Sequence, residues 1–144
     1  MGWRETRARI SERTATRCSA QMPCVRLVSS SGGLRARVAA HAGIDGERLA
    51  EVLVTEYPAR AGIGWHRDAP MFGTVIGVSL LSACRFRFRR DAAARDVRTA
   101  IVAPRSAYVL DGPARAQWQH SIPAAPSPRY SVTFRTLRGD KTVR

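Results

Sequence analysis

Two histidines and one aspartate are the residues of this chain best suited to chemistry. His66 and Asp68 are separated by one residue, and His120 follows far along the sequence. Side chains two residues apart on a β-strand point to the same face, so His66 and Asp68 could bind one metal ion together. His120, from a distant strand, would complete a set of two histidines and one carboxylate. Such a set leaves coordination positions open and is typical of non-heme Fe(II) oxygenases.

The alternative is a chance His-x-Asp sequence, which on its own is weak evidence for a metal site. The chain has three histidines. His66 and His120 lie in strand-like segments with neighbouring aromatic residues, whereas His41 follows a helical pattern. We expect His41 at the surface or at the C-terminal end of that helix. The surrounding sequence has to decide between the two interpretations.

Two arginines near the C-terminus could bind an anionic co-substrate. The period of a β-strand places residues 129, 131, 133 and 135 on one face, so Arg129 and Arg135 can point into the same cavity. A guanidinium binds a carboxylate with two parallel hydrogen bonds, so this pair of arginines suits an anionic ligand. The alternative is surface charge on an edge strand of an arginine-rich chain.

Composition limits the class of protein. The chain has 144 residues, enough for one domain, and a formal net charge of +13. That charge favours a polyanionic partner such as nucleic acid, although the excess of arginine over the single lysine, Lys141, also fits a GC-rich genome. Three cysteines without metal-binding spacing argue against a disulfide framework. We find no secretory signal and no membrane-spanning run, so we expect a cytoplasmic protein. We also expect a monomer.

The order of patterns predicts a mainly β domain. Residues 1–33 are expected to form an extension, either disordered or arising from a mis-started gene, and residues 139–144 a tail. Residues 34–41 are expected to be helical, with Gly43 as the stop. Many short strands with glycine and proline turns follow, which favours a sandwich or jelly roll. The strands are expected at 52–57, 62–68, 74–81, 84–89, 97–102, 107–110 and 129–137.

One of these strands alternates cleanly between apolar and basic residues. Cys84, Phe86 and Phe88 are expected to face the core, because every second residue of a strand points to the same side. The arginines at 85, 87 and 89 are then expected on the opposite, outward face. This face would be either a solvated edge or a track for a phosphate backbone.

From residue 34 to residue 138 the chain resembles the AlkB family of Fe(II)- and 2-oxoglutarate-dependent dioxygenases. The resemblance implies a double-stranded β-helix, that is, a jelly roll with a short N-terminal helical segment. It also implies that iron is bound by His66, Asp68 and His120. The segments that carry the resemblance are 55–57, 63–68, 75–80, 104–108, 118–123 and 129–135.

The same resemblance implies how 2-oxoglutarate binds. Arg129 is expected to hold its distal carboxylate with help from the Tyr57 hydroxyl, and Arg135 to work nearer the iron. The family commonly has asparagine where this chain has Thr55 and Ser131. Both replacements keep a hydrogen-bonding side chain, so these two residues are also expected at the co-substrate.

The implied activity is oxidative removal of N-alkyl groups from nucleic-acid bases, with O2 as second co-substrate and release of succinate, CO2 and formaldehyde. The substrate would be single-stranded or flipped out of a duplex. DNA-repair members carry an acidic residue shortly after the ligand aspartate, but residues 69–71 here are Ala-Pro-Met. RNA, protein or a small molecule therefore remain alternative substrates, and a catalytically silent domain that binds polyanions is a further alternative. Candidate substrate contacts are Trp65, Arg67 and Arg85, although alternation turns Trp65 and Arg67 away from His66.

Overall fold

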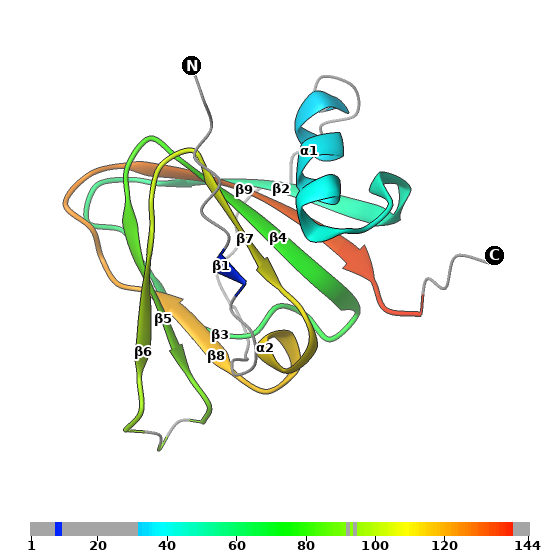
Figure 1. Ribbon diagram of the computed structural model, residues 1–144. Helices are drawn as coiled ribbons and strands as arrows, with labels where there is room; N and C mark the ends of the chain where they lie inside the picture. Colours follow the sequence, from blue (N-terminus) through cyan, green and yellow to red (C-terminus); the bar gives the residue numbers. More distant parts are fainter. Residues whose placement is uncertain (1–7, 10–31, 92, 94, 140–144) are drawn as a thin grey trace.

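Two facing β-sheets form the body of the protein, and one helix lies against the larger sheet (Figure 1). The computed structural model describes residues 8–9, 32–91, 93 and 95–139. These residues lie mostly in β-strands, with one short helix near the N-terminal end, so the expected mainly β fold is confirmed. The elements are β1 (Ala8–Arg9), α1 (Gly32–Ala42), a 3-10 helix η1 (Gly46–Arg48), β2 (Leu49–Tyr57), β3 (Ile63–His66), β4 (Phe72–Leu80), β5 (Cys84–Arg89), β6 (Arg98–Val102), β7 (Ser106–Leu110), α2 (Gly112–Ala116), β8 (Gln119–Ile122) and β9 (Arg129–Leu137).

The strand order is that of a jelly roll, in which the chain passes repeatedly between the two sheets, with β5 and β6 forming a hairpin within one of them. The larger sheet has the order β1-β7-β4-β9-β2 and the smaller sheet the order β3-β8-β5-β6. All neighbouring strands are antiparallel except β1 and β7. As a result, β2 and β3 lie at edges of different sheets although they are consecutive in sequence.

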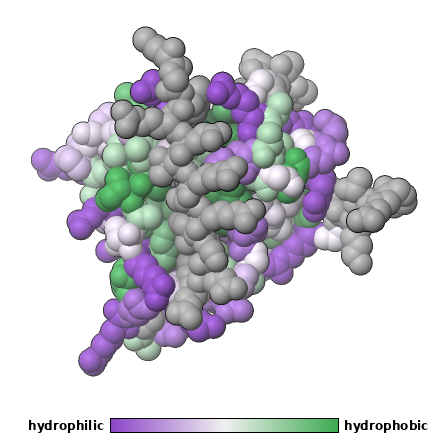
Figure 2. Space-filling model, in the orientation of Figure 1, coloured by the Kyte–Doolittle hydropathy of each residue, from purple (hydrophilic) through white to green (hydrophobic). Residues whose placement is uncertain are grey.

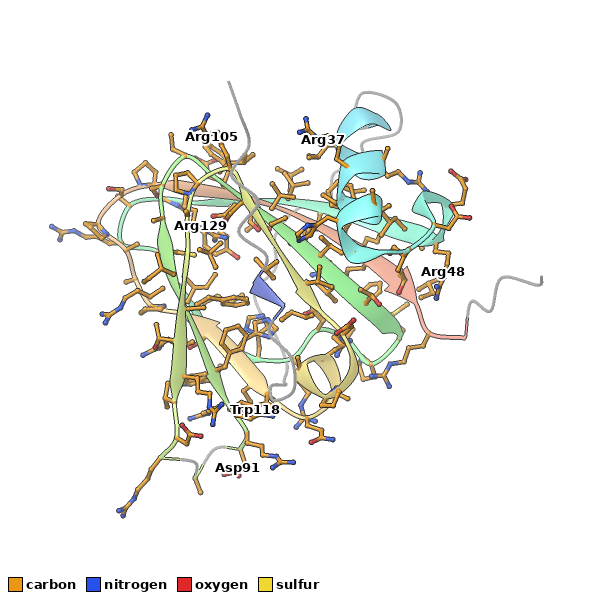
Figure 3. All side chains as sticks on the ribbon, in the orientation of Figure 1. Arg37, Arg48, Asp91, Arg105, Trp118 and Arg129 are labelled. Carbon is orange, nitrogen blue, oxygen red and sulfur yellow. The ribbon has the colours of Figure 1, made fainter. Side chains whose placement is uncertain are left out.

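Side chains from both sheets fill the space between them (Figure 3). The predicted alternation of β5 is confirmed, because Cys84, Phe86 and Phe88 are buried in this core. Trp118 and Leu110 join them from the segments on either side of α2. This packing fixes the two sheets relative to each other, since apolar area removed from water is the main stabilising contribution.

A second core lies between α1 and the other face of the larger sheet. Val38 and Ala39 of the helix are buried in it, together with Ile76 and Phe134 from β4 and β9. The predicted helix and its stop are confirmed: Gly43 has φ of 70°, a conformation that favours glycine after a helix end. None of the described helices is long and apolar enough to cross a membrane.

Some expected boundaries differ from the structure. The strand expected at 62–68 ends at His66, so Asp68 lies in the following loop. The short helix α2 was not predicted, because its five residues begin with Gly112 and Pro113, which also signal a turn. Most of the extension expected at 1–33 lies outside the described residues, and the pairing of β1 with β7 was not expected.

Hydrophilic and apolar residues both appear on the surface in view. Figure 2 shows the hydrophilic residues mainly toward the edges of this face, with smaller apolar areas between them. The large apolar side chains that are exposed come from separate loops and strand ends, as with Met71, Leu81 and Ile101. Single exposed apolar residues of this kind are normal for soluble domains and do not define a binding site.

Gly77 of β4 is needed because it lies against the ring of Tyr108 on β7. A Cβ atom at residue 77 would come within 2.1 Å of the Tyr108 ring. No real Cβ tolerates that distance, so the ring would have to move. Tyr108 is buried and packs against Phe86 with ring centroids 4.7 Å apart, which leaves it little freedom on that side.

We therefore expect Gly77→Ala to lower the free energy of unfolding by about 1–3 kcal/mol, the usual cost of overpacking a core. Chemical denaturation measures this change. Gly33→Ala is the matched control, because nothing lies within 4 Å of a Cβ there and the site is helical. Equal midpoints for Gly77→Ala and the wild-type chain would contradict the predicted clash.

Candidate metal centre

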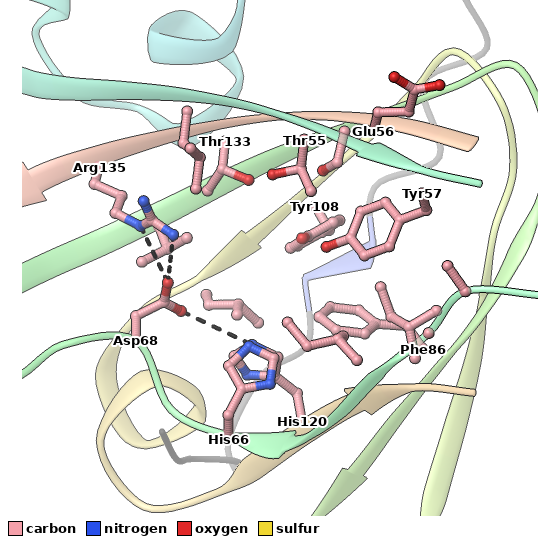
Figure 4. A pocket seen from close by; sticks show the side chains of 18 of the residues that line it. Thr55, Glu56, Tyr57, His66, Asp68, Phe86, Tyr108, His120, Thr133 and Arg135 are labelled. Atoms are coloured by element: carbon pink, nitrogen blue, oxygen red, sulfur yellow. Dashed lines mark hydrogen bonds and ion pairs between the residues drawn. The ribbon is translucent and has the colours of Figure 1, made fainter. Parts of the chain in front are cut away.

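A cavity of about 310 Å³ lies between the two sheets, on the side where β2 and β3 form the edges. Its polar lining includes the predicted residues Thr55, Tyr57 and Ser131 (Figure 4). His66, Asp68, His120 and Arg135 also line it, so the chain brings all three predicted metal ligands to one hollow. Phe86, Val75, Leu110 and Ile122 supply the apolar part of the wall.

The two histidines are neighbours on adjacent strands. His66 of β3 pairs directly with His120 of β8, and their ring centroids are 4.1 Å apart. The Nδ1 atom of His66 lies 2.8 Å from the carbonyl oxygen of Gly64. A carbonyl can only accept, so Nδ1 carries the proton and donates it. The Nε2 atom is left with a lone pair for a metal, which is the usual arrangement of a metal-binding histidine.

Burial keeps both imidazoles neutral. It lowers the pKa of His120 to about 3, with a further contribution from neighbouring His66. The pKa of His66 is also lowered, again mainly by burial. A neutral imidazole is the form that binds metal, so neither histidine has to lose a proton first at neutral pH.

Asp68 lies beyond the end of β3 and faces both an arginine and a histidine. Its Oδ1 atom accepts hydrogen bonds from Nε and Nη2 of Arg135 at 3.0 and 2.9 Å. Its Oδ2 atom lies 3.8 Å from Nε2 of His120 (Figure 4). Burial alone would raise the pKa of Asp68, but the charge of Arg135 and its hydrogen bonds to the carboxylate oppose this, and the pKa lies below its usual range. The carboxylate is therefore ionised, as a metal ligand must be.

The donor set fits Fe(II), with one adjustment. Two neutral imidazoles and one carboxylate are the ligands of the facial triad in non-heme iron oxygenases. Among the described residues, no three His, Cys, Asp or Glu side chains already stand around one metal position. The Asp68 side chain is turned toward Arg135, so a metal ion between the histidines would draw its Oδ2 atom further toward them.

Arg135 sits between two carboxylates. Besides Asp68 it forms an ion pair with Glu51, which lies directly opposite it on β2. Burial lowers the pKa of Arg135, but the two carboxylates more than compensate and the net shift is upward. Sequence reasoning missed Glu51. Its strand pairs with the C-terminal strand, and only that pairing identifies it as the partner of Arg135. Arg135 lines the cavity beside Asp68, and its three guanidinium nitrogens are bound to Asp68 and Glu51.

Arg129 is a buried cation with two donors that are unpartnered within the described residues. Its side chain is 2% exposed, and its Nε donates to Ser79 Oγ at 3.1 Å. Both Nη atoms are buried and have no hydrogen-bond partner in the described part of the chain. The guanidinium lies 5.0 Å from the centre of the Tyr57 ring, which lines the cavity. A buried cation with unpaired donors costs several kcal/mol, so this place fits a carboxylate ligand.

Thr55 and Ser131 are directly opposite each other on β2 and β9, and both line the cavity. Thr133 and Arg135 line it too, so three of the four residues predicted to share a face border the cavity, whereas Arg129, the fourth, is not among the lining residues. Tyr108 both packs in the core and borders the cavity.

The three candidate substrate contacts lie elsewhere. Arg67 and Arg85 are exposed, and none of the three lines the cavity. Trp65 is half-buried on the outer face of the smaller sheet, where the guanidiniums of Arg87 and Arg89 lie 5.1 and 4.5 Å from its ring centre. The expectation that Trp65 points away from His66 agrees with this place.

Arg115 of α2 was missed by sequence reasoning, yet it holds the loop that carries Asp68. Its Nη2 atom donates to the carbonyl oxygens of Asp68, Ala69 and Phe72 at 3.2, 2.6 and 2.9 Å. The side chain is 5% exposed, and burial lowers its pKa. Since Asp68 lies outside β3, these bonds replace the strand pairing that would otherwise fix its backbone. Nothing in the local sequence distinguishes this arginine from the many others.

Three comparisons with known proteins bear on this site. The family model of the 2OG-Fe(II) oxygenase superfamily matches residues 1–136. The uncharacterized protein L905 of Acanthamoeba polyphaga mimivirus is 27% identical to this chain, with 63% of this chain and 50% of L905 covered. The solved structure of OsALKBH1, an AlkB homologue, is similar with a TM-score of 0.51 and 18% identity, over 72% of this chain and 58% of that chain.

These comparisons agree with the expected family resemblance. The match to the superfamily supports the iron and 2-oxoglutarate chemistry, and the likeness to OsALKBH1 confirms the fold. The chain spans half the length of L905 and 58% of OsALKBH1.

The metal site predicts a specific loss of metal binding. Loss of a residue that only hydrogen-bonds to a metal ligand weakens metal binding roughly 10- to 100-fold. We expect His120→Ala, which removes a ligand itself, to weaken Mn(II) binding by more than this. Isothermal titration measures the affinity, and His41→Ala, in the last turn of α1, is the matched control. Equal affinities for the His120 and His41 variants would contradict the proposed ligand.

If Arg115 holds the loop that carries Asp68, its removal should lower both the stability of the protein and its affinity for metal. We expect Arg115→Met to lower the free energy of unfolding by about 1–3 kcal/mol, because three backbone carbonyls lose a buried, charged donor. Mn(II) affinity should fall about tenfold as the Asp68 loop loosens. Arg115→Lys should restore part of the affinity.

Arg138→Met is the control for this pair, since exposed Arg138 donates to the same Phe72 carbonyl at 3.2 Å. We expect it to cost less than about 0.5 kcal/mol and to leave the metal affinity unchanged. If Arg115→Met leaves the metal affinity unchanged while the protein is folded, the clamp does not position Asp68.

Proposed function

We propose that this chain, which belongs to the 2OG-Fe(II) oxygenase superfamily, is a dioxygenase that removes N-alkyl groups from nucleic-acid bases. The observation that carries the proposal is the buried guanidinium of Arg129, whose Nη donors lack partners among the described residues. The guanidinium packs against Tyr57, which lines the cavity together with two neutral histidines and an ionised aspartate. A site with this composition suits a metal ion and a dicarboxylate together.

The residues divide into a metal end and an anion end. His66, Asp68 and His120 would hold Fe(II), and Arg129 would bind the far carboxylate of 2-oxoglutarate. Bound Fe(II), 2-oxoglutarate and O2 together supply the oxidation that hydroxylates an N-alkyl carbon, which then leaves as formaldehyde while succinate and CO2 are released. The protein orients both substrates and keeps water out, which is the usual contribution of a protein to cofactor chemistry.

The neighbours of Arg129 would position the co-substrate. Tyr57 borders the cavity over the guanidinium, and Thr55 and Ser131 offer hydroxyl groups on the same side. Ser79 accepts a hydrogen bond from the Nε atom, so the two Nη atoms are the donors that a ligand would engage. A carboxylate bound by a fixed guanidinium is oriented as well as attracted.

A nucleic-acid substrate is supported by the net charge of +13 and the AlkB-like fold. One observation favours a second candidate, the same chemistry on a substrate other than a cationic alkylated base. Residues 69–71 are exposed and contain no carboxylate, and Glu56 and Asp68 are the acidic residues that border the cavity within the described ranges. Glu56 accepts a hydrogen bond from Tyr130, so its charge is partly engaged.

The test is incubation of the protein with Fe(II), ascorbate, 2-oxoglutarate and a single-stranded oligonucleotide that contains N1-methyladenine, followed by mass spectrometry. We expect methyl loss with succinate, both absent in His66→Ala. Arg129→Met should need on the order of a hundredfold more 2-oxoglutarate for half-maximal rate, because removing one member of a buried charge pair costs about 2–5 kcal/mol. Arg95→Met, at an exposed hairpin position, is its control.

Succinate without methyl loss would retain the oxygenase and replace the substrate by the second candidate. Neither product, from protein shown to be folded, would leave the silent polyanion-binding domain as the explanation. Equal 2-oxoglutarate dependence for the Arg129 and Arg95 variants would contradict the assigned anion site.

A further inference from the structure

The outer face of the smaller sheet carries a row of arginines over a tryptophan. Arg85, Arg87 and Arg89 alternate with the buried residues of β5, so all three point away from the core. Residues two apart on a strand are separated by about 6.6 Å, so the row presents positive charges at regular intervals. Figure 1 shows β5 in the middle of the smaller sheet, between β8 and β6.

Trp65 is clamped against this row. The guanidiniums of Arg87 and Arg89 both lie within 5.1 Å of its ring centre, at distances typical of cation–π contacts. Arg87 Nε donates to Ser121 Oγ at 3.2 Å, and Arg89 Nε donates to Gln119. These bonds and contacts hold the two side chains in place, so binding an anion there costs little further conformational entropy.

The row is not neutralised by its own surroundings. In the described part of the chain, none of Arg85, Arg87 and Arg89 forms an ion pair. The two Nε bonds above go to neutral acceptors, a hydroxyl and an amide. Unpaired arginines ordered by neutral groups favour an anionic partner, because the charge is available and the geometry is set.

The row also lies next to the cavity through one strand. Trp65 and His66 are consecutive residues of β3, and β3 is an edge strand. Trp65 lies on the outer face, whereas His66 lines the cavity. A polymer that passes over the edge at β3 can therefore reach the cavity with one unit and the arginine row with the units beside it.

We propose that the surface formed by Trp65, Arg85, Arg87 and Arg89 binds the phosphodiester backbone of a single-stranded nucleic acid whose base enters the cavity. Basic tracks combined with an aromatic ring are the common means of binding single strands without sequence preference. This inference rests on the proposed function, since it assumes that the cavity accepts a nucleobase.

The test is fluorescence anisotropy of a labelled, unmethylated oligothymidylate with the full chain and Fe(II), without 2-oxoglutarate, across a range of salt concentrations. We expect the variant Arg85→Gln/Arg87→Gln/Arg89→Gln to bind at least tenfold more weakly than wild type. Its plot of log affinity against log salt should be shallower by about 2, because each lost phosphate contact removes about 0.7 from the slope for single strands. Trp65→Ala should weaken binding about tenfold through lost stacking.

The matched control is Arg37→Gln/Arg105→Gln/Arg138→Gln, which removes the same charge from exposed positions on α1, the β6–β7 turn and the end of β9. We expect it to lose less than threefold in affinity. Equal losses for the two triple variants would overturn the proposed surface, because binding would then follow net charge alone. Competition by polyglutamate of equal charge as strong as that by oligothymidylate would overturn nucleic acid as the partner.

Binding is measured without turnover, so this test is independent of dealkylation. If wild type demethylates the oligonucleotide while the Arg85/Arg87/Arg89 variant binds normally, the surface is wrong and the proposed function stands. If wild type binds through this surface yet demethylates nothing, the surface stands and the proposed function fails. Melting curves of each variant verify that it is folded.

Discussion

Burial of the Asp68 carboxylate is the interaction on which the rest of the site depends. A charge taken out of water is stable only when opposite charge and hydrogen bonds replace its solvent. Arg135 does this for the side chain, and Arg115 fixes the backbone of the loop. Because Asp68 lies past the end of β3, its place is set by these two arginines from β9 and α2. Three separate parts of the chain must therefore fold together before the metal end exists.

The cavity follows from the sizes of the side chains on the inner faces. Phe86, Phe88 and Trp118 fill the space between the sheets in one region. Toward the β2 edge, the inner face carries Thr55 and Ser131, which are too small to reach the opposite sheet. The larger sheet borders the hollow that remains with both hydroxyl and apolar side chains, and the smaller sheet borders it with two imidazoles. The jelly roll thus places the proposed co-substrate residues Thr55 and Ser131 and the proposed histidine ligands on facing walls.

Much of this arrangement was predictable from the sequence, because strand alternation is a local property. It placed Phe86 in the core and Ser131, Thr133 and Arg135 on one face. It failed where position depends on distant contacts, as in the bend after His66 that leaves Asp68 in a loop. Arg115 was not identifiable, since its role depends on a carbonyl cluster 43–47 residues earlier in the chain.

The central claim is that one cavity holds a metal ion at Asp68 and the two histidines while Arg129 holds a carboxylate. The most direct test is a crystal structure of the full chain grown with Mn(II) and 2-oxoglutarate in the absence of oxygen, with the metal located by anomalous scattering. The expected result is a metal peak bonded to His66 Nε2, His120 Nε2 and the Asp68 carboxylate, with the distal carboxylate of 2-oxoglutarate on the Nη atoms of Arg129. A metal bound at other residues, or a co-substrate that leaves Arg129 without a partner, would contradict it.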